Sequence, residues 1–209
     1  MSGIIGHHGK SGNLGQIGSG EILIKDTVVS SGSTLIMDNV FSGEFRNYNV
    51  ICSDMLHNQA ANSIKLLCRL IKEDGAQQSG NVYRAASGGV EGNSGSNNNS
   101  QSQRGWNTGE FDVTPAGGSM NNDAGSGGIQ LNMIFHNPFQ ATHLCRVTWN
   151  SGMMRYGGDV VHAATGFCLE ADQRTTRYRG FRFHLTSGSF SYGRVSVYGW
   201  RSNKDNNVI

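Results

Sequence analysis

The fold class of this chain is decided by the stretch Tyr178-Arg-Gly-Phe-Arg-Phe-His-Leu-Thr-Ser-Gly-Ser-Phe-Ser-Tyr-Gly-Arg-Val-Ser-Val-Tyr-Gly-Trp-Arg201. Its apolar positions are Phe181, Phe183, Leu185, Val195 and Val197, each separated from the next in its half by one polar residue. Successive side chains of a strand point to opposite faces, so this alternation predicts two strands that are apolar on one face and polar on the other. Between them, Gly188 can adopt the positive φ that a tight turn needs. The stretch therefore predicts a half-buried antiparallel hairpin.

Composition supports the same class for the whole chain. Among the 209 residues there are 30 glycines and only 2 prolines, and charged residues make up 15%, against roughly 25% in average globular proteins. Ser, Asn, Gln and Thr replace the missing charge, and these residues favour turns and wet strand faces over helices. We expect an all-β protein: an antiparallel, jelly-roll-like β-sandwich.

Further strands are predicted at short, regular spacing along the chain, with no alternation of strands and helices. Those before the hairpin are expected at 22–29, 34–40, 49–56, 63–71, 81–86, 128–136, 142–149 and 160–171. The segment 63–71 is apolar on much of both faces, which is typical of a central strand. Residues 87–105 and 116–128 are rich in Gly, Asn and Ser, and we expect flexible excursions there, with an exposed flap around 106–114 between them.

The first 20 residues contain seven glycines and only isolated large apolar side chains. Such a segment cannot bury enough surface to fold alone. We expect a division into an N-terminal attachment arm, 1–20, and a β-sandwich domain, 21–209. If the arm docks on a partner, its anchors are Ile4, Ile5, Leu14 and Ile17. The arm also lacks the continuous apolar stretch of a secretory signal.

Charge and motifs exclude several functions. The net charge of +2 is too small to indicate nucleic acid or an anionic membrane as a partner, and the apolar runs are too short to span a bilayer. Gly9-Lys10-Ser11 is not a phosphate loop, because Ile4 occupies the position of the required glycine. Arg179-Gly-Phe-Arg-Phe183 departs from an RNA-binding strand, since Arg182 replaces a small residue.

Candidate chemistry is sparse. The cysteines have no CxxC spacing, and we interpret Cys52, Cys68, Cys145 and Cys168 as reduced core residues. The histidines form no HExxH motif, and convergence of His7-His8 across a threefold axis is a minor alternative for metal binding. Two carboxylate pairs share strand faces, Glu110/Asp112 and Glu170/Asp172, which leaves glycan hydrolysis or calcium binding as an alternative to solvated faces. We expect no catalytic residue, metal or cofactor.

Aromatic and arginine side chains are the candidates for contacts. Trp106 lies between two polar stretches and, with Tyr156, is a candidate for stacking on a sugar or packing against a neighbouring subunit. Six arginines gather between 174 and 201. On neighbouring strands they would form a stripe that pairs with carboxylates of an adjacent subunit, with Arg179 and Arg182 as the leading candidates.

Four segments carry a resemblance to a known family. The block 157–200, above all Tyr178–Phe183, Ser187-Gly188 and Gly193–Gly199, resembles the closing strands of bacteriophage virion proteins of the tail-fibre or decoration type, common in marine and cyanobacterial phages. Met37–Tyr48 and Leu66–Ile71 are similar to the opening segment and the central strand of that module. Met1–Gly6 with Lys10-Ser-Gly resembles the peptide by which some phage fibres attach to the particle.

The resemblance covers about residues 35–201 and the first twenty or so. It implies a non-enzymatic structural protein located in the virion, often a homotrimer. The arm would attach to other virion proteins of the tail or capsid, and the body would contact the host surface, including its glycans. A capsid decoration protein that cements the head without a host ligand is the alternative.

Overall fold

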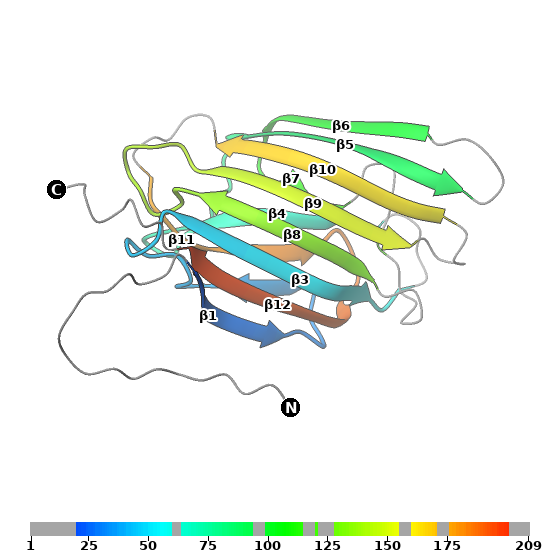
Figure 1. Cartoon of the computed structure of the whole chain (residues 1–209), viewed down its shortest axis with the longest axis horizontal. Coiled ribbons are helices and arrows are strands. Elements are labelled where there is room, and N and C mark those ends of the chain that lie inside the picture. Colours follow the sequence, from blue (N-terminus) through cyan, green and yellow to red (C-terminus); the bar gives the residue numbers. More distant parts are fainter. Residues whose placement is uncertain are drawn as a thin grey trace.

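The computed structural model describes residues 20–59, 64–93, 99–114, 120, 128–154, 160–170 and 176–200. They form two antiparallel sheets, and the all-β sandwich is confirmed. The larger sheet has eight strands in the order β1-β12-β3-β8-β9-β10-β5-β6 and the smaller has four in the order β2-β11-β4-β7. Figure 1 shows the strands of the larger sheet side by side from β1 to β6, with the smaller sheet behind them.

The larger sheet consists of β1 (Glu21–Val28), β3 (Asn47–His57), β5 (Tyr83–Asn93), β6 (Asn99–Thr108), β8 (Ile129–His136), β9 (Arg146–Met154), β10 (Val160–Glu170) and β12 (Phe190–Trp200). The smaller sheet consists of β2 (Thr34–Met37), β4 (Leu66–Lys72), β7 (Phe111–Asp112) and β11 (Tyr178–Leu185).

Eight of these strands have the connectivity of a jelly roll. The first strand pairs with the last, β1 with β12, and the next pairs follow inward: β2 with β11, β3 with β8, and β4 with β7. The remaining strands, β5, β6, β9 and β10, extend the larger sheet beyond β8. The larger sheet is therefore wider than the smaller one.

The predicted closing hairpin is wrong. β11 pairs with β2 and β4, whereas β12 pairs with β1 and β3, so the two strands lie in different sheets. Each strand does have the predicted apolar face, with Phe181 and Val195 fully buried. The two apolar faces meet across the core of the sandwich instead of lying side by side on one sheet. A hairpin and two strands on opposite sheets require the same alternation of apolar and polar residues, so the sequence pattern does not distinguish them. Gly188 has the predicted positive φ, 75°, in the connection between the sheets.

Two other expectations change. The segment 87–105 is not an irregular excursion over its described residues, because β5 and β6 pair in register there from Glu91↔Asn99 to Ala85↔Gly105. Residues 106–114 are not an exposed flap, because Phe111 and Val113 are buried in the core. The excursion at 116–128 lies outside the described residues except for Met120 and Gly128.

The core lies between the two sheets and is rich in aromatic rings. Phe181 is in contact with Phe41, Phe135 and Phe183, with ring centroids 5.8, 5.1 and 5.2 Å apart. A second group joins Phe111 to Tyr83 and Trp149 at 5.5 and 5.6 Å. All four cysteines are free thiols and buried, as predicted.

Candidate functional site

Several of the predicted contact residues lie outside the described residues. These are the arm residues Ile4, Ile5, Leu14 and Ile17, together with Tyr156. Trp106 lies on β6, where its backbone is paired with Arg84 of β5, and the description does not extend to its side chain.

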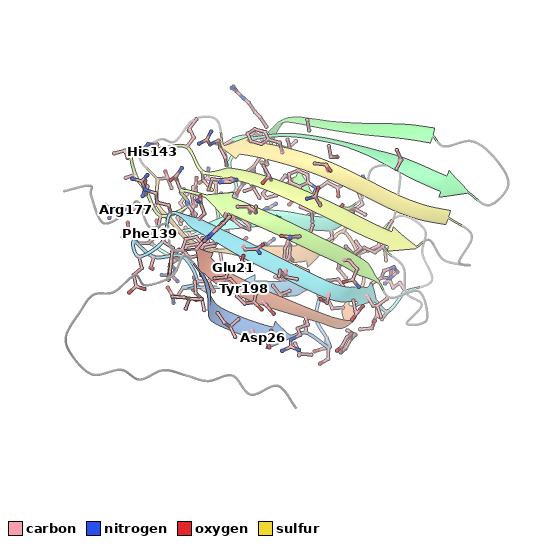
Figure 2. All side chains as sticks on the ribbon, viewed as in Figure 1. Glu21, Asp26, Phe139, His143, Arg177 and Tyr198 are labelled. Carbon is pink, nitrogen blue, oxygen red and sulfur yellow. The ribbon has the colours of Figure 1, made fainter. Side chains whose placement is uncertain are left out.

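The four C-terminal arginines that the structure describes do not form one stripe, and Arg174 and Arg201 lie outside the described residues. Because β11 and β12 belong to different sheets, Arg182 lies on the smaller sheet and Arg194 on the larger one. Arg194 binds Asp26 of the edge strand β1, with 2.7 Å between Nη2 and Oδ2. Arg177 lies over the ring of Phe139, 5.7 Å from its centroid, and Figure 2 shows these two at the same end of the sandwich.

Arg179 is held within the chain. Its Nε and Nη2 donate to the two carboxylate oxygens of Asp38 at 2.7 and 2.6 Å, and Nη1 donates to the Glu73 carbonyl at 3.3 Å. These bonds tie the start of β11 to the loop after β2. Hydrogen bonding from Arg179 and from the Asn39 backbone lowers the pKa of Asp38.

This ion pair makes stability depend on pH. We expect Asp38→Asn to destabilise the protein at pH 7 by about 1 kcal/mol. A bidentate ion pair contributes more than a single contact, but the partial exposure of this one reduces its contribution. Because the pKa of Asp38 is lower in the folded state, its contribution is present above the unfolded pKa and is lost as pH falls through the folded pKa. The difference between the two proteins in urea unfolding should therefore vanish in acid. Glu44→Gln, in the same loop region, is the control and should be neutral; a pH-independent Asp38→Asn effect would contradict the prediction.

On the outer face of the smaller sheet, several charged side chains face one another. In β11, residues 181, 183 and 185 point into the core, which places Arg182 and His184 on the outer face. Across the strands, Arg182 lies opposite Arg69 of β4.

Glu110, beside β7, is the centre of this group. Its Oε2 accepts hydrogen bonds from Arg69 Nε and Nη2 at 2.9 and 2.7 Å, and lies 3.0 Å from His184 Nε2. Burial, which outweighs the attraction of Glu110, lowers the pKa of His184 and favours its neutral ring. Its proton then belongs on Nε2, the nitrogen that faces the carboxylate. We call Arg69, Glu110, Arg182 and His184 the Arg182 cluster.

The carboxylates of the predicted pair Glu110/Asp112 have separate partners. Asp112 Oδ2 is 2.8 Å from Lys65 Nζ, and its Oδ1 accepts from the backbone of Thr114 at 2.9 Å. Each carboxylate is therefore paired with its own basic side chain. An acid–base pair requires one protonated and one ionised carboxyl with pKa values held apart, and this arrangement favours two ion pairs instead. Of the second predicted pair, Asp172 lies outside the described residues.

Arg182 is unlike Arg69, Arg179 and Arg194, each of which forms an ion pair with a carboxylate. Among the described residues it has no carboxylate partner, and its Nε is buried without a hydrogen bond. Burial and the charge of Arg69 lower its pKa, which Glu110 partly offsets. Like charges directly opposite on neighbouring strands are destabilising. Two guanidinium groups and one carboxylate leave the cluster with a net charge of +1.

A groove of about 780 Å³ borders this cluster: Arg69 and Glu110 line it, whereas Arg182 and His184 lie beside it. It runs from Arg69 and Glu110 past the edge of the smaller sheet toward β5 and β9, where the larger sheet continues beyond it. The groove is lined by Lys65, Leu67, Arg69, Asn81, Ala85, Ala86, Ser87, Thr108, Gly109, Glu110, Phe111, Asp112 and Trp149.

Two further findings apply to the described residues. Within them, no three His, Cys, Asp or Glu side chains are placed to share a metal ion. The same residues include no helix with the length and apolarity needed to cross a membrane.

Sequence reasoning found part of this site. It named Arg182 and Glu110, but it omitted Arg69 and the groove. The sequence does contain an indication of Arg69, because it is the one charged residue inside the apolar strand 66–71. A charge within such a strand requires a partner, which marks the residue as a candidate for an ion pair. The partner, Glu110, is far along the chain, and only strand pairing brings them together. Comparison with protein-family models, curated proteins and solved structures gives no match, so the interpretation of the site depends on its own geometry.

Proposed function

We propose that this chain is a non-enzymatic structural protein of a bacteriophage particle. Its N-terminal arm attaches to other virion proteins, and its body is exposed as a short tail fibre or host-contacting component, often as a homotrimer. The observation that carries the proposal is the jelly-roll connectivity of the body, because this fold recurs in viral capsid proteins and in lectin domains. The resemblance of segments 1–12, 37–48 and 157–200 to virion modules supports the same assignment.

The charged groups support a binding role over catalysis. Glu110 and Asp112 are held by Arg69 and Lys65 at 2.7 and 2.8 Å. Carboxylates fixed in this way orient polar contacts, whereas a general acid or nucleophile has to change its charge or form a bond during the reaction.

A second candidate is a capsid decoration protein that joins capsomers. It is favoured by the breadth of the eight-stranded sheet, whose outer face carries exposed apolar side chains near its β1 edge, among them Leu23 and Trp200. Figure 2 places Asp26 and Tyr198 in the same edge region of this sheet. Stoichiometry separates the two candidates, since a fibre occurs in tens of copies at the tail and a decoration protein in hundreds over the head.

The arm is tested by its removal. We expect a chain lacking residues 2–19 to fold like the full chain and to be absent from purified particles, because its attachment contacts are lost. Circular dichroism checks the fold, and quantitative mass spectrometry of the particles measures incorporation.

A full-length variant with Ile4, Ile5, Leu14 and Ile17 all changed to Ser keeps the length of the arm and removes only its apolar anchors. It should lose incorporation as well. Normal incorporation of the truncated chain would refute the attachment role, and normal incorporation of the serine variant alone would assign attachment to the backbone of the arm.

A further inference from the structure

The geometry points to a binding site for an acidic saccharide at the Arg182 cluster and the groove beside it. The ligand's carboxylate would lie between Arg182 and Arg69, and its sugar rings would extend along the groove. This inference rests on the proposed function, for which it names the class of host molecule that the body contacts.

The first step concerns charge. Arg182 and Arg69 are paired directly across β11 and β4, and Glu110 is bound to Arg69 and His184. The cluster is short of one negative charge, and a bound monoanion would supply it. Within the described part of the chain, no carboxylate forms an ion pair with Arg182.

The second step concerns the shape of the anion. Arginine presents planar donors that match a carboxylate, and among the described residues the Arg182 Nε is buried without a hydrogen bond. Arg69 uses Nε and Nη2 for Glu110, so its Nη1 is outside that pair and is the donor we assign to the anion. Two donor groups from neighbouring strands can therefore hold one carboxylate.

The third step concerns the rest of the ligand. The groove volume of about 780 Å³ lies within the range of about 300–1,000 Å³ that is common for ligand sites. Beyond Arg69, its lining combines the polar residues Asn81, Thr108 and Ser87 with the apolar residues Ala85 and Phe111. Hydroxyl groups and C–H faces alternate around a sugar ring, so a saccharide presents the groups that this lining can bind.

The compensated ion pair Lys65–Asp112 adds polar contacts without adding charge. Lys65 Nζ and Asp112 Oδ2 are 2.8 Å apart on the rim of the groove, and both side chains retain exposed surface. The rim therefore favours uncharged hydroxyl groups. One carboxylate at the cluster and neutral rings in the groove describe a saccharide in which a single terminal acidic sugar, a uronate or a sialate, is joined to neutral sugars.

The experiment measures binding by the full chain at pH 7 and low salt, using isothermal titration calorimetry. The probes are sialyllactose and glucuronosyl-xylobiose as saccharides with one acidic sugar on neutral rings, maltotriose as a neutral one, and inorganic phosphate as an anion without a sugar. We expect at least one acidic saccharide to bind ten or more times as tightly as maltotriose and phosphate. Arg182→Gln should weaken that binding at least tenfold.

Arg194→Gln is the matched control, because Arg194 is paired with Asp26 on the other sheet, and it should leave the affinity unchanged. Thermal unfolding without ligand gives a second readout. Arg182→Gln should melt at or above the wild-type temperature, since it removes a like-charge contact, whereas a clear fall would reveal a partner within the chain and overturn the assignment.

Three other results would overturn the proposal: no binding of either acidic saccharide, equal binding of maltotriose, or phosphate binding as tight as that of the acidic saccharides. The outcome is separate from that of the virion proposal. Deletion of the arm tests attachment to the particle, whereas the Arg182 variant tests ligand binding by the body, and either can fail while the other holds.

Discussion

Replacing Phe181 by alanine is expected to destabilise the protein by about 3–5 kcal/mol, the range for truncating a buried phenylalanine. Phe181 is fully buried, and its ring lies between Phe41, Phe135 and Phe183, with centroids 5.1–5.8 Å away. Phe41 belongs to a loop, Phe135 to the opposite sheet and Phe183 to the same strand as Phe181. These three elements cannot all move inward to fill the cavity that the substitution leaves. Urea unfolding monitored by fluorescence measures the loss.

Phe167→Ala is the matched control for this prediction. Phe167 lies on β10, and 43% of its surface is exposed, so its truncation should change stability by about 0.5 kcal/mol or less. Equal effects of the two substitutions would show that the aromatic group around Phe181 is not the centre of the core.

Gly180→Ala should have an effect of comparable size, about 3 kcal/mol, at the upper end of the cost of overpacking. Gly180 lies on β11 where the strand passes the end of β2, and a methyl group there would overlap the Met37 carbonyl oxygen. The backbone next to it is held in place, because Val40 and Phe41 both donate to the Arg179 carbonyl at 2.9 Å. The overlap therefore cannot be relieved by rotating a side chain.

The control for this second substitution is Gly43→Ala. A methyl group at Gly43 would come no closer than 4.0 Å to its nearest neighbour, Phe139 Cδ1, so we expect a change within about 0.5 kcal/mol. Thermal unfolding of both variants compares the two sites directly. A Gly180→Ala protein as stable as the wild type would mean that β2 and β11 can move apart at no cost.

The strands were predictable where alternation is clear, and less so where it is weak. The segment 128–136 is a strand at 129–136, with Ile129, Leu131, Met133 and Phe135 all buried. The Gly- and Ser-rich strands β5 and β6 were missed over most of their length, because few of their side chains are apolar. These strands are formed by main-chain pairing with β10 and with each other, a contribution that alternation does not reveal.

The candidate site was predictable one residue at a time but not as a group. Arg182 was recognisable as a polar residue between two core phenylalanines, and Glu110 as one of a carboxylate pair. Their proximity depends on β4, which lies between β11 and β7 and contributes Arg69. Sequence separation hides this contact, because Arg69 and Glu110 are 41 positions apart.

The stretch 178–201 shows which features the sequence determines and which depend on the tertiary structure. Its alternation predicted two strands and the burial of Phe181, Phe183, Leu185, Val195 and Val197, and the glycine between them predicted the positive φ at Gly188; the strands are 178–185 and 190–200. Only the tertiary structure decided that they belong to opposite sheets. A strand with one apolar face is equally satisfied beside its sequence neighbour or across a core from it, and pairing with β1, β2, β3 and β4 selects the second arrangement. The placement of β11 and β12 on opposite sheets separates Arg194 from Arg182. It also places Arg182 opposite Arg69, in a cluster that has two guanidinium groups and one carboxylate.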